Sequence, residues 1–225
     1  LARISFDADA GLVWANCLAG PRAHTKQRFA QMMSEYDLPL VVASFLVAVL
    51  AAYAALFFGA RLVNAESGER RKWLLAGALL MGTGVWTMHF VGMRAMPMGV
   101  PMSFDVIMTL VSWFAAVLAS GVALHIIGRK QLGVPLFVSA TLSMASGIVV
   151  MHYLGMYAMR MSAPPTFNTV FLLISIAIAV VASGAALALC RKLQGMDGSG
   201  TLAVQFVAAL AMAAAICGMH YTGMM

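Results

Sequence analysis

Charged residues are scarce in this sequence of 225 residues: 10% are Asp, Glu, Lys or Arg, whereas 62% are hydrophobic. A soluble domain usually has about 25% charged and about 45–50% apolar residues. So few charges leave too little polar surface to coat a water-soluble globule. The mean hydropathy of +0.90 agrees, and the composition therefore excludes an ordinary soluble protein.

Cysteine pairs, a basic face and a catalytic grouping are also lacking. Cys17, Cys190 and Cys217 contain no C-x-x-C pair and are too few for a disulfide scaffold. The formal net charge is +6, but the basic residues are scattered among short loops without interleaved aromatic residues. No nucleophile, base and orienting acid stand out together. We therefore expect neither a nucleic-acid partner nor enzymatic activity.

The sequence instead has six long stretches without a charged residue. Each can cross the hydrocarbon core of a bilayer, which takes about 20 apolar residues in a helix. Unbroken apolar runs exclude the alternating pattern of a membrane β-barrel. We therefore predict an all-α membrane protein with six transmembrane helices. The stretches are Leu38 to Ala60, Trp73 to Met93, Val106 to Gly128, Gln131 to Met159, Met161 to Cys190 and Gly198 to Met225.

Basic residues gather in three of the loops between these stretches. Loops 61–72, 128–133 and 191–200 hold eight Lys and Arg residues, against Arg94 and Arg160 at the opposite ends. Cytoplasmic loops carry the excess of positive charge in membrane proteins, so these three loops are predicted to be cytoplasmic. The N-terminus then lies on the outer side of the membrane.

Residues 1–35 differ from the rest of the chain. They are mixed in composition, lack the apolar core of a signal peptide and do not begin with Met. Their basic residues also oppose an outside N-terminus. We expect a tail that is disordered or foreign to the natural protein, which would start at Met32 or Met33. The membrane domain would span residues 36–225.

The membrane domain repeats itself three times. The segments MGTGVWTMHFVGMRAM, MASGIVVMHYLGMYAM and MAAAICGMHYTGMM align on three histidines: His89, His152 and His220. The preceding stretches align in the same register, each on a serine: Ser44, Ser112 and Ser175. Self-similarity of this kind indicates a repeat architecture. We predict three tandem helix pairs, at about 36–103, 104–166 and 167–225.

The aligned histidines are the strongest candidates for a functional site. A histidine inside a membrane segment costs free energy unless it is paired or solvated. The methionine four residues after each histidine lies on the same helix face. Imidazole suits copper, zinc and iron, and thioether sulfur favours Cu(I), so we predict a copper site near the outer face. Its candidate ligands are His89, His152, His220, Met93, Met156 and Met224.

Two arrangements of this site are open. Three repeats around a common axis bring equivalent helix faces inward, and an ion is tolerated more easily inside a bundle than at a lipid-facing surface. We therefore favour one ion shared by the three histidines. The alternative is three independent sites, each with one histidine and one methionine. The methionines also have an ordinary role as flexible filler of apolar cores.

Other residues near the outer ends are candidates for supporting the ligands. Asp37, Asp105 and Asn168 precede the first, third and fifth helices, where capping the helix is their ordinary role. The alternative is that they accept a hydrogen bond from the ring nitrogen that does not bind the metal. Tyr153 and Tyr221 are considered for the same support, with anchoring at the membrane interface as their ordinary role.

The segments TMHFVGM, VMHYLGM and GMHYTGM resemble the MHYT family of bacterial sensor domains, named for its Met-His-Tyr-Thr motif. The resemblance covers residues 36–225. It implies an inner-membrane sensor with its motifs toward the periplasm. Such a sensor would detect a diatomic gas (O2, CO or NO) through protein-bound copper, or would detect copper itself. The signal would pass to a cytoplasmic output domain for cyclic-di-GMP turnover or a histidine kinase. Two features depart from the family: Phe90 replaces the first tyrosine, and the seventh helix is missing.

Two other classes of function are weighed against this one. A haem-binding membrane electron carrier would use pairs of histidines on different helices as axial ligands, which three histidines at one depth fit poorly. A copper or ion transporter should carry polar groups across the midplane, where these helices offer only serine and threonine. The oligomeric state is open, with a homodimer as one option.

Overall fold

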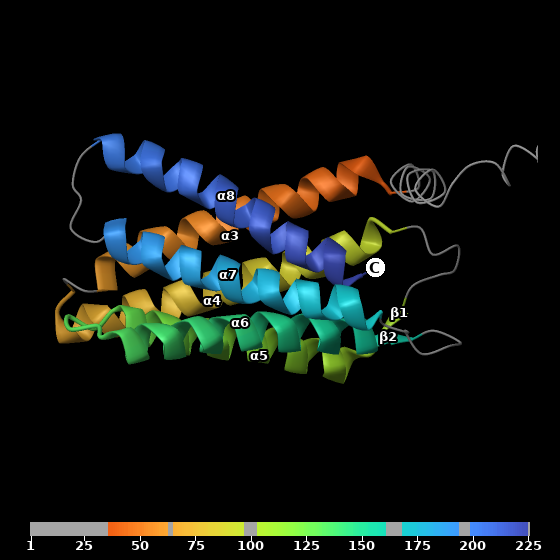
Figure 1. The fold of residues 1–225 in the computed structure, drawn as a ribbon, viewed down its shortest axis with the longest axis horizontal. Coiled ribbons are helices and arrows are strands. Elements are labelled where there is room, and N and C mark those ends of the chain that lie inside the picture. The colour runs from red at the N-terminus through yellow and green to blue at the C-terminus, as the bar shows by residue number, and fades with distance from the viewer. Residues whose placement is uncertain (1–35, 63–64, 97–102, 161–167, 194–198, 225) are drawn as a thin grey trace, which may run out of the picture. The chain divides into compact units, whose positions relative to one another are not determined.

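The computed structural model describes residues 36–62, 65–96, 103–160, 168–193 and 199–224. The predictions for residues 1–35, including a start at Met32 or Met33, fall outside these ranges. The described residues form six long helices and one pair of short strands (Figure 1). The helices are α3 (Leu38–Leu62), α4 (Ser67–Arg94), α5 (Val106–Ile127), α6 (Val134–Tyr157), α7 (Thr169–Leu193) and α8 (Ser199–Gly223); the strands are β1 (Ser103–Phe104) and β2 (Met159–Arg160).

All six helices are long and apolar enough to cross a membrane, with spans of 22 to 27 residues. Large apolar side chains cover their outward faces: Leu50, Ile107 and Val181 are 69%, 74% and 71% exposed. In water such a surface would drive aggregation, whereas in lipid it is the favoured exterior. The prediction of an all-α, multi-pass membrane protein with six transmembrane helices is confirmed.

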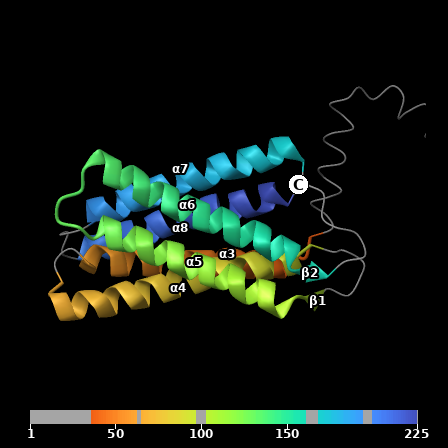
Figure 2. The same cartoon turned by 90° about the horizontal axis from the view of Figure 1, so that it is seen from below.

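The helices pack in chain order and close into a ring. Each helix contacts the next one along the chain, and α8 returns to pack against α3. The helices α4, α6 and α8, which carry the aligned histidines, also approach one another inside the ring, with α4 contacting both α6 and α8. The three predicted helix pairs are therefore arranged around a common axis, with the strand pair at one end of the bundle (Figure 2).

After the orientation predicted from the loop charges, we call the end with the strand pair the outer end and the opposite end the inner end. The strands β1 and β2 are antiparallel, with Phe104 opposite Met159. They connect the start of α5 to the end of α6, so the predicted helix of the fourth stretch ends at Tyr157 and Met159 belongs to a strand. Two helix starts show the predicted capping, because Asp105 accepts from Met108 N–H at 3.0 Å and Asn168 from Val170 N–H at 2.9 Å.

Candidate metal centre

The three aligned histidines meet inside the ring of helices. His89 of α4, His152 of α6 and His220 of α8 are each 0% exposed. Their ring centroids lie 4.9, 4.9 and 5.3 Å apart. In the part of the chain that the structure describes, they are the one group of three or more His, Cys, Asp or Glu side chains close enough to hold a metal ion.

All three imidazoles turn the same nitrogen, Nδ1, toward one another. The Nδ1 atom of His89 lies 3.0 Å from that of His220 and 3.1 Å from that of His152, and the third distance is 3.3 Å. Three atoms with these separations lie on a circle with a radius of about 1.8 Å, close to the metal–imidazole bond length of about 2.0 Å. The trio therefore fits a metal ion that is bound by three nitrogen atoms.

Hydrogen bonds alone cannot satisfy this trio. A neutral imidazole nitrogen either carries a proton and donates, or has a lone pair and accepts. Among three nitrogens in mutual contact, at most two of the three pairs can join a donor to an acceptor. The remaining pair sets two lone pairs or two protons against each other in a buried site, where such a conflict is costly. A cation among the three lone pairs removes the conflict.

The glycine three residues after each histidine makes room for the imidazole of another repeat. A Cβ atom added to any of these glycines would overlap Nε2 of the ring that faces it. The pairs are His89 on Gly155, His152 on Gly223 and His220 on Gly92. The contacts run in one direction around the axis, so each repeat positions the histidine of its neighbour. The small glycine side of each histidine-bearing helix is therefore filled by the imidazole of another repeat.

The outward-turned nitrogens, Nε2, are buried and have no hydrogen-bond partner of good geometry among the described residues. The polar residues considered as supports make other contacts. Asp105 accepts from Met108 N–H and from Arg160, and Asn168 accepts from Val170 N–H. Asp37 lies exposed immediately before α3. These contacts belong to helix starts and to the outer surface.

The two tyrosines lie closer to the histidines. The ring of Tyr153 is edge-on to His152, with centroids 4.8 Å apart, and that of Tyr221 is edge-on to His220 at 4.9 Å. Their hydroxyls lie within hydrogen-bond distance of Ser175 and Ser44. The tyrosines therefore pack against the imidazoles while their polar atoms reach neighbouring helices.

The candidate methionines form a separate cluster, one helical turn beyond the histidines. Met93 and Met156 are 0% and 6% exposed and lie with Met159 of β2. Phe90, Phe104 and Met224 pack against this cluster. The thioethers thus connect the histidine turn of the helices to the strand pair. The structure brings the three predicted methionines together and adds Met159.

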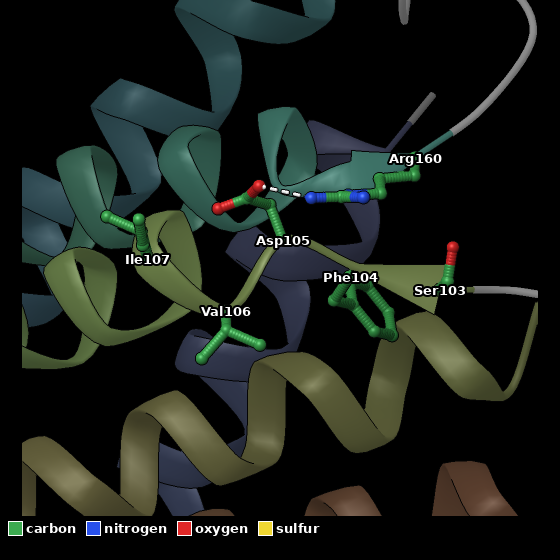
Figure 3. Close-up of a pocket in the computed structure, with 6 residues that line it drawn as sticks. All are labelled: Ser103, Phe104, Asp105, Val106, Ile107 and Arg160. Carbon is green, nitrogen blue, oxygen red and sulfur yellow. Dashed lines mark hydrogen bonds and ion pairs between the residues drawn. The ribbon is translucent and has the colours of Figure 1, made fainter.

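An ion pair holds the strand pair at the outer surface (Figure 3). Arg160 donates to Asp105 Oδ2 at 2.9 Å, and Asp105 N–H donates to Ala158 O at 2.7 Å. The hydrogen bond from Arg160 lowers the pKa of the Asp105 carboxyl from its usual value. Both side chains border a shallow hollow of about 400 Å³, together with Phe104 and Ile107.

Comparisons with known proteins agree with the repeat. Residues 27–77, 82–140 and 146–204 match a family model described as MHYT, bacterial signalling protein N terminal repeat. The second and third matches begin within α4 and α6, whereas the first begins before α3. The family model therefore divides the same threefold pattern in a different register from the helix pairs. No solved structure shows a significant match.

Three curated proteins are similar over most of this chain. It is 42% identical over 194 residues to the bifunctional diguanylate cyclase/cyclic di-GMP phosphodiesterase MucR of Pseudomonas aeruginosa, covering 86% of this chain and 28% of MucR. The cyclic di-GMP phosphodiesterase NbdA of the same species is 35% identical over 189 residues, covering 84% and 24%. The signaling protein YkoW of Bacillus subtilis is 33% identical over 192 residues, covering 84% and 24%. The chain thus spans about a quarter of the length of these relatives.

Proposed function

Because the chain belongs to the MHYT family of bacterial signalling proteins, we propose that its helix bundle is a sensory input domain that binds one copper ion through His89, His152 and His220. The observation that carries this proposal is the convergence of three buried Nδ1 atoms, 3.0 to 3.3 Å apart, from three repeats. Such a convergence fits a cation and conflicts with hydrogen bonding among neutral rings.

The donor set favours copper over zinc. Imidazole nitrogen suits both metals, whereas thioether sulfur selects Cu(I). Met93, Met156 and Met224 supply thioethers one helical turn from the histidines, and Met159 adds a fourth. When bound, copper supplies a redox-active centre that accepts a diatomic gas as a further ligand. The histidines hold this centre, and their burial keeps bulk water away from it.

The same geometry speaks against haem. Two axial histidine nitrogens on a haem iron lie on opposite sides of the porphyrin, separated by two bond lengths of about 2.0 Å each. Nδ1 atoms that are 3.0 to 3.3 Å apart leave no room for a porphyrin between any two of these rings. A haem carrier would require the three helices to separate.

The signal that the bundle passes on is the position of α4, α6 and α8 relative to one another. A ligand that binds better to one arrangement of the three histidines shifts the population of bundles toward that arrangement, by no more than the difference in affinity. We place the trio toward the periplasm of the inner membrane, since the loops at the other end carry the excess of Lys and Arg. The natural partner is a cytoplasmic output domain. MucR and NbdA are named for cyclic-di-GMP enzymes, which supports an output of this kind.

Metal analysis of the protein purified in detergent after loading with copper tests the proposal. We expect about one copper per chain in the wild type and almost none after His89→Ala, His152→Ala or His220→Ala alone, because a three-histidine centre needs all its ligands. His125→Ala is the matched control, since this exposed histidine of α5 lies outside the trio and its loss should leave the copper content unchanged.

Three outcomes would contradict the proposal. An intense Soret band in the absorption spectrum would replace copper with haem. About three copper ions per chain, with one lost for each histidine removed, would replace the shared site with three independent sites, as additivity of separate sites requires. A wild type that binds no copper under either oxidising or reducing conditions would refute the metal site itself.

A further inference from the structure

Three serines occupy equivalent buried positions in α3, α5 and α7. Ser44, Ser112 and Ser175 are each 0% exposed. Each hydroxyl donates to the backbone carbonyl three residues earlier, at distances of 2.7, 2.7 and 2.8 Å. A serine hydroxyl has a single proton. Its oxygen can therefore only accept a hydrogen bond from any further partner.

In two repeats this further partner is the tyrosine that follows the histidine. Tyr221 Oη lies 3.0 Å from Ser44 Oγ, and Tyr153 Oη lies 2.8 Å from Ser175 Oγ. Because the proton of each serine is already donated to the backbone, the tyrosines must be the donors. Each bond joins a histidine-bearing helix to its neighbour in the ring and fixes the aromatic ring that packs against the imidazole.

The first repeat cannot make this bond in the same way, because Phe90 has no hydroxyl. Trp86, one helical turn earlier on α4, replaces the missing donor. Its indole Nε1 donates to Ser112 Oγ at 3.2 Å and to Thr109 O at 3.2 Å. The indole also packs on Phe90 with centroids 4.9 Å apart, and Phe90 is edge-on to His89 at 4.9 Å.

We propose that Trp86 is the positioning residue of the first repeat and supplies to His89 what Tyr153 and Tyr221 supply to their own histidines. It donates to the buried serine of the neighbouring helix and thereby fixes the aromatic ring beside the imidazole. An indole N–H has no lone pair with which to bind a metal. Because an indole fills this role in the first repeat, the role cannot be metal ligation. Tyr153 and Tyr221 are therefore also hydrogen-bond donors and not ligands.

The repeat suggests that the hydrogen-bond donor to Ser112 can be moved from Trp86 to residue 90. Phe90 is equivalent to Tyr153 and Tyr221, and Ser112 is equivalent to Ser175 and Ser44. A tyrosine at position 90 therefore points its hydroxyl toward Ser112. The functional consequence rests on the proposed copper site, whereas the exchange of hydrogen-bond donors can be measured without any metal.

The experiment compares Trp86→Phe with the double variant Trp86→Phe, Phe90→Tyr in the full chain in detergent. Copper affinity, from competition with a chelator, should fall about tenfold in the single variant and return to within about twofold of the wild type in the double variant, as expected for a residue that orients a ligand. The midpoint of thermal unfolding of the metal-free protein should fall and recover in parallel.

Trp113→Phe is the matched control. The indole of Trp113 donates to Thr83 Oγ1 at 3.0 Å, so it also joins α5 to α4. It is not one of the aromatic rings that pack against the histidine trio, which are Phe90, Tyr153 and Tyr221. This variant should lower the unfolding midpoint while leaving copper affinity at the wild-type value. It separates the positioning of His89 from the general loss of one buried indole hydrogen bond.

Three results would overturn the inference: wild-type copper affinity in Trp86→Phe, no recovery in the double variant, or an equal loss of affinity in Trp113→Phe. If the wild type itself binds no copper, the proposed function fails and the functional consequence fails with it. The unfolding midpoints would then decide the remaining part, because a double variant that is no more stable than Trp86→Phe would refute the exchange of donors.

Discussion

The outer and inner halves of the bundle are built on different principles. The inner half is packed by aliphatic side chains that are at most 3% exposed: Leu56, Leu62, Leu124, Ile127, Leu187 and Leu193. The outer half buries three imidazoles that are 0% exposed and a cluster of methionines that are at most 7% exposed: Met93, Met156 and Met159. Aliphatic side chains are satisfied by contact alone, whereas imidazoles also require partners for their nitrogens. The imidazole nitrogens of the outer half therefore need partners that the packing of apolar side chains does not supply.

The arginines at the two ends show the same contrast. At the inner end, Arg191 donates to the carbonyls of Ile127, Arg129 and Lys130 and so joins α7 to the turn between α5 and α6. At the outer end, Arg160 binds a carboxylate. The inner contacts are to groups that do not titrate. The outer contact depends on the charge of its partner, so the groups whose chemistry matters are concentrated at the outer end.

The largest effect should come from the glycine contacts of the trio. In Gly155→Ala, the new Cβ would overlap His89 Nε2, so the ring must shift and its Nδ1 must leave its position relative to the other two. We expect copper affinity to fall about a hundredfold, the upper end of the range for loss of a residue that orients a metal ligand. Alanine is itself the better helix former. The bundle should therefore remain folded, which circular dichroism checks.

Gly121→Ala tests the same substitution in the inner half. An added Cβ there would lie 3.4 Å from Ala78 Cβ, an ordinary contact, so copper affinity and fold should both stay unchanged. If Gly155→Ala bound copper as tightly as the wild type, the glycine contacts would not be what holds the histidines in place.

The sequence alone predicted that the histidines would meet. Equivalent positions in three tandem helix pairs share one depth and one face, so the repeat places His89, His152 and His220 together without any knowledge of the packing. The six helices followed from the length of the apolar runs. The strand pair was missed because two residues per strand are too few for a periodic signal.

The choice of nitrogen and the aromatic–serine bonds could not be predicted in this way. Which nitrogen of His89 faces inward depends on how its ring rests on Gly155, a contact between different helices. Ser112 in an apolar helix indicates only a small interface residue. Its recurrence as Ser44 and Ser175 was the signal that could have identified it. Val149 and Cys217 occupy the positions equivalent to Trp86, so its role as a donor does not recur in the sequence and needed the structure.

A smaller effect is expected from the thioethers. Met93→Leu keeps the volume of a fully buried side chain but removes its sulfur, and such exchanges usually cost less than about 1.5 kcal/mol in stability. If the methionine cluster helps to bind Cu(I), the affinity for Cu(I) should fall about tenfold while that for Cu(II) changes little. Met81→Leu, twelve residues earlier on the same helix, is the control and should alter neither affinity. Equal affinities in all three proteins would leave the methionines as core filler.

The smallest effect concerns the ion pair at the outer surface. Arg160 lowers the pKa of Asp105, so the carboxylate contributes stability that is complete above the pKa of the unfolded chain and is lost as the pH falls through the lower pKa of the folded state. Exposed pairs of this kind contribute little, and Arg160 is 69% exposed. The unfolding midpoint of Arg160→Gln should therefore lie slightly below that of the wild type at neutral pH and converge with it in acid.

Arg191→Gln gives the inner-end counterpart of this measurement. Its lost hydrogen bonds end on backbone carbonyls, which keep the same charge throughout the titration. The difference in unfolding midpoint between Arg191→Gln and the wild type should therefore be larger at neutral pH and should persist in acid. Thermal unfolding of the three proteins across the acid range checks both statements. A difference for Arg160→Gln that is as large in acid as at neutral pH would show that Arg160 acts through packing of its side chain and not through the charge of Asp105.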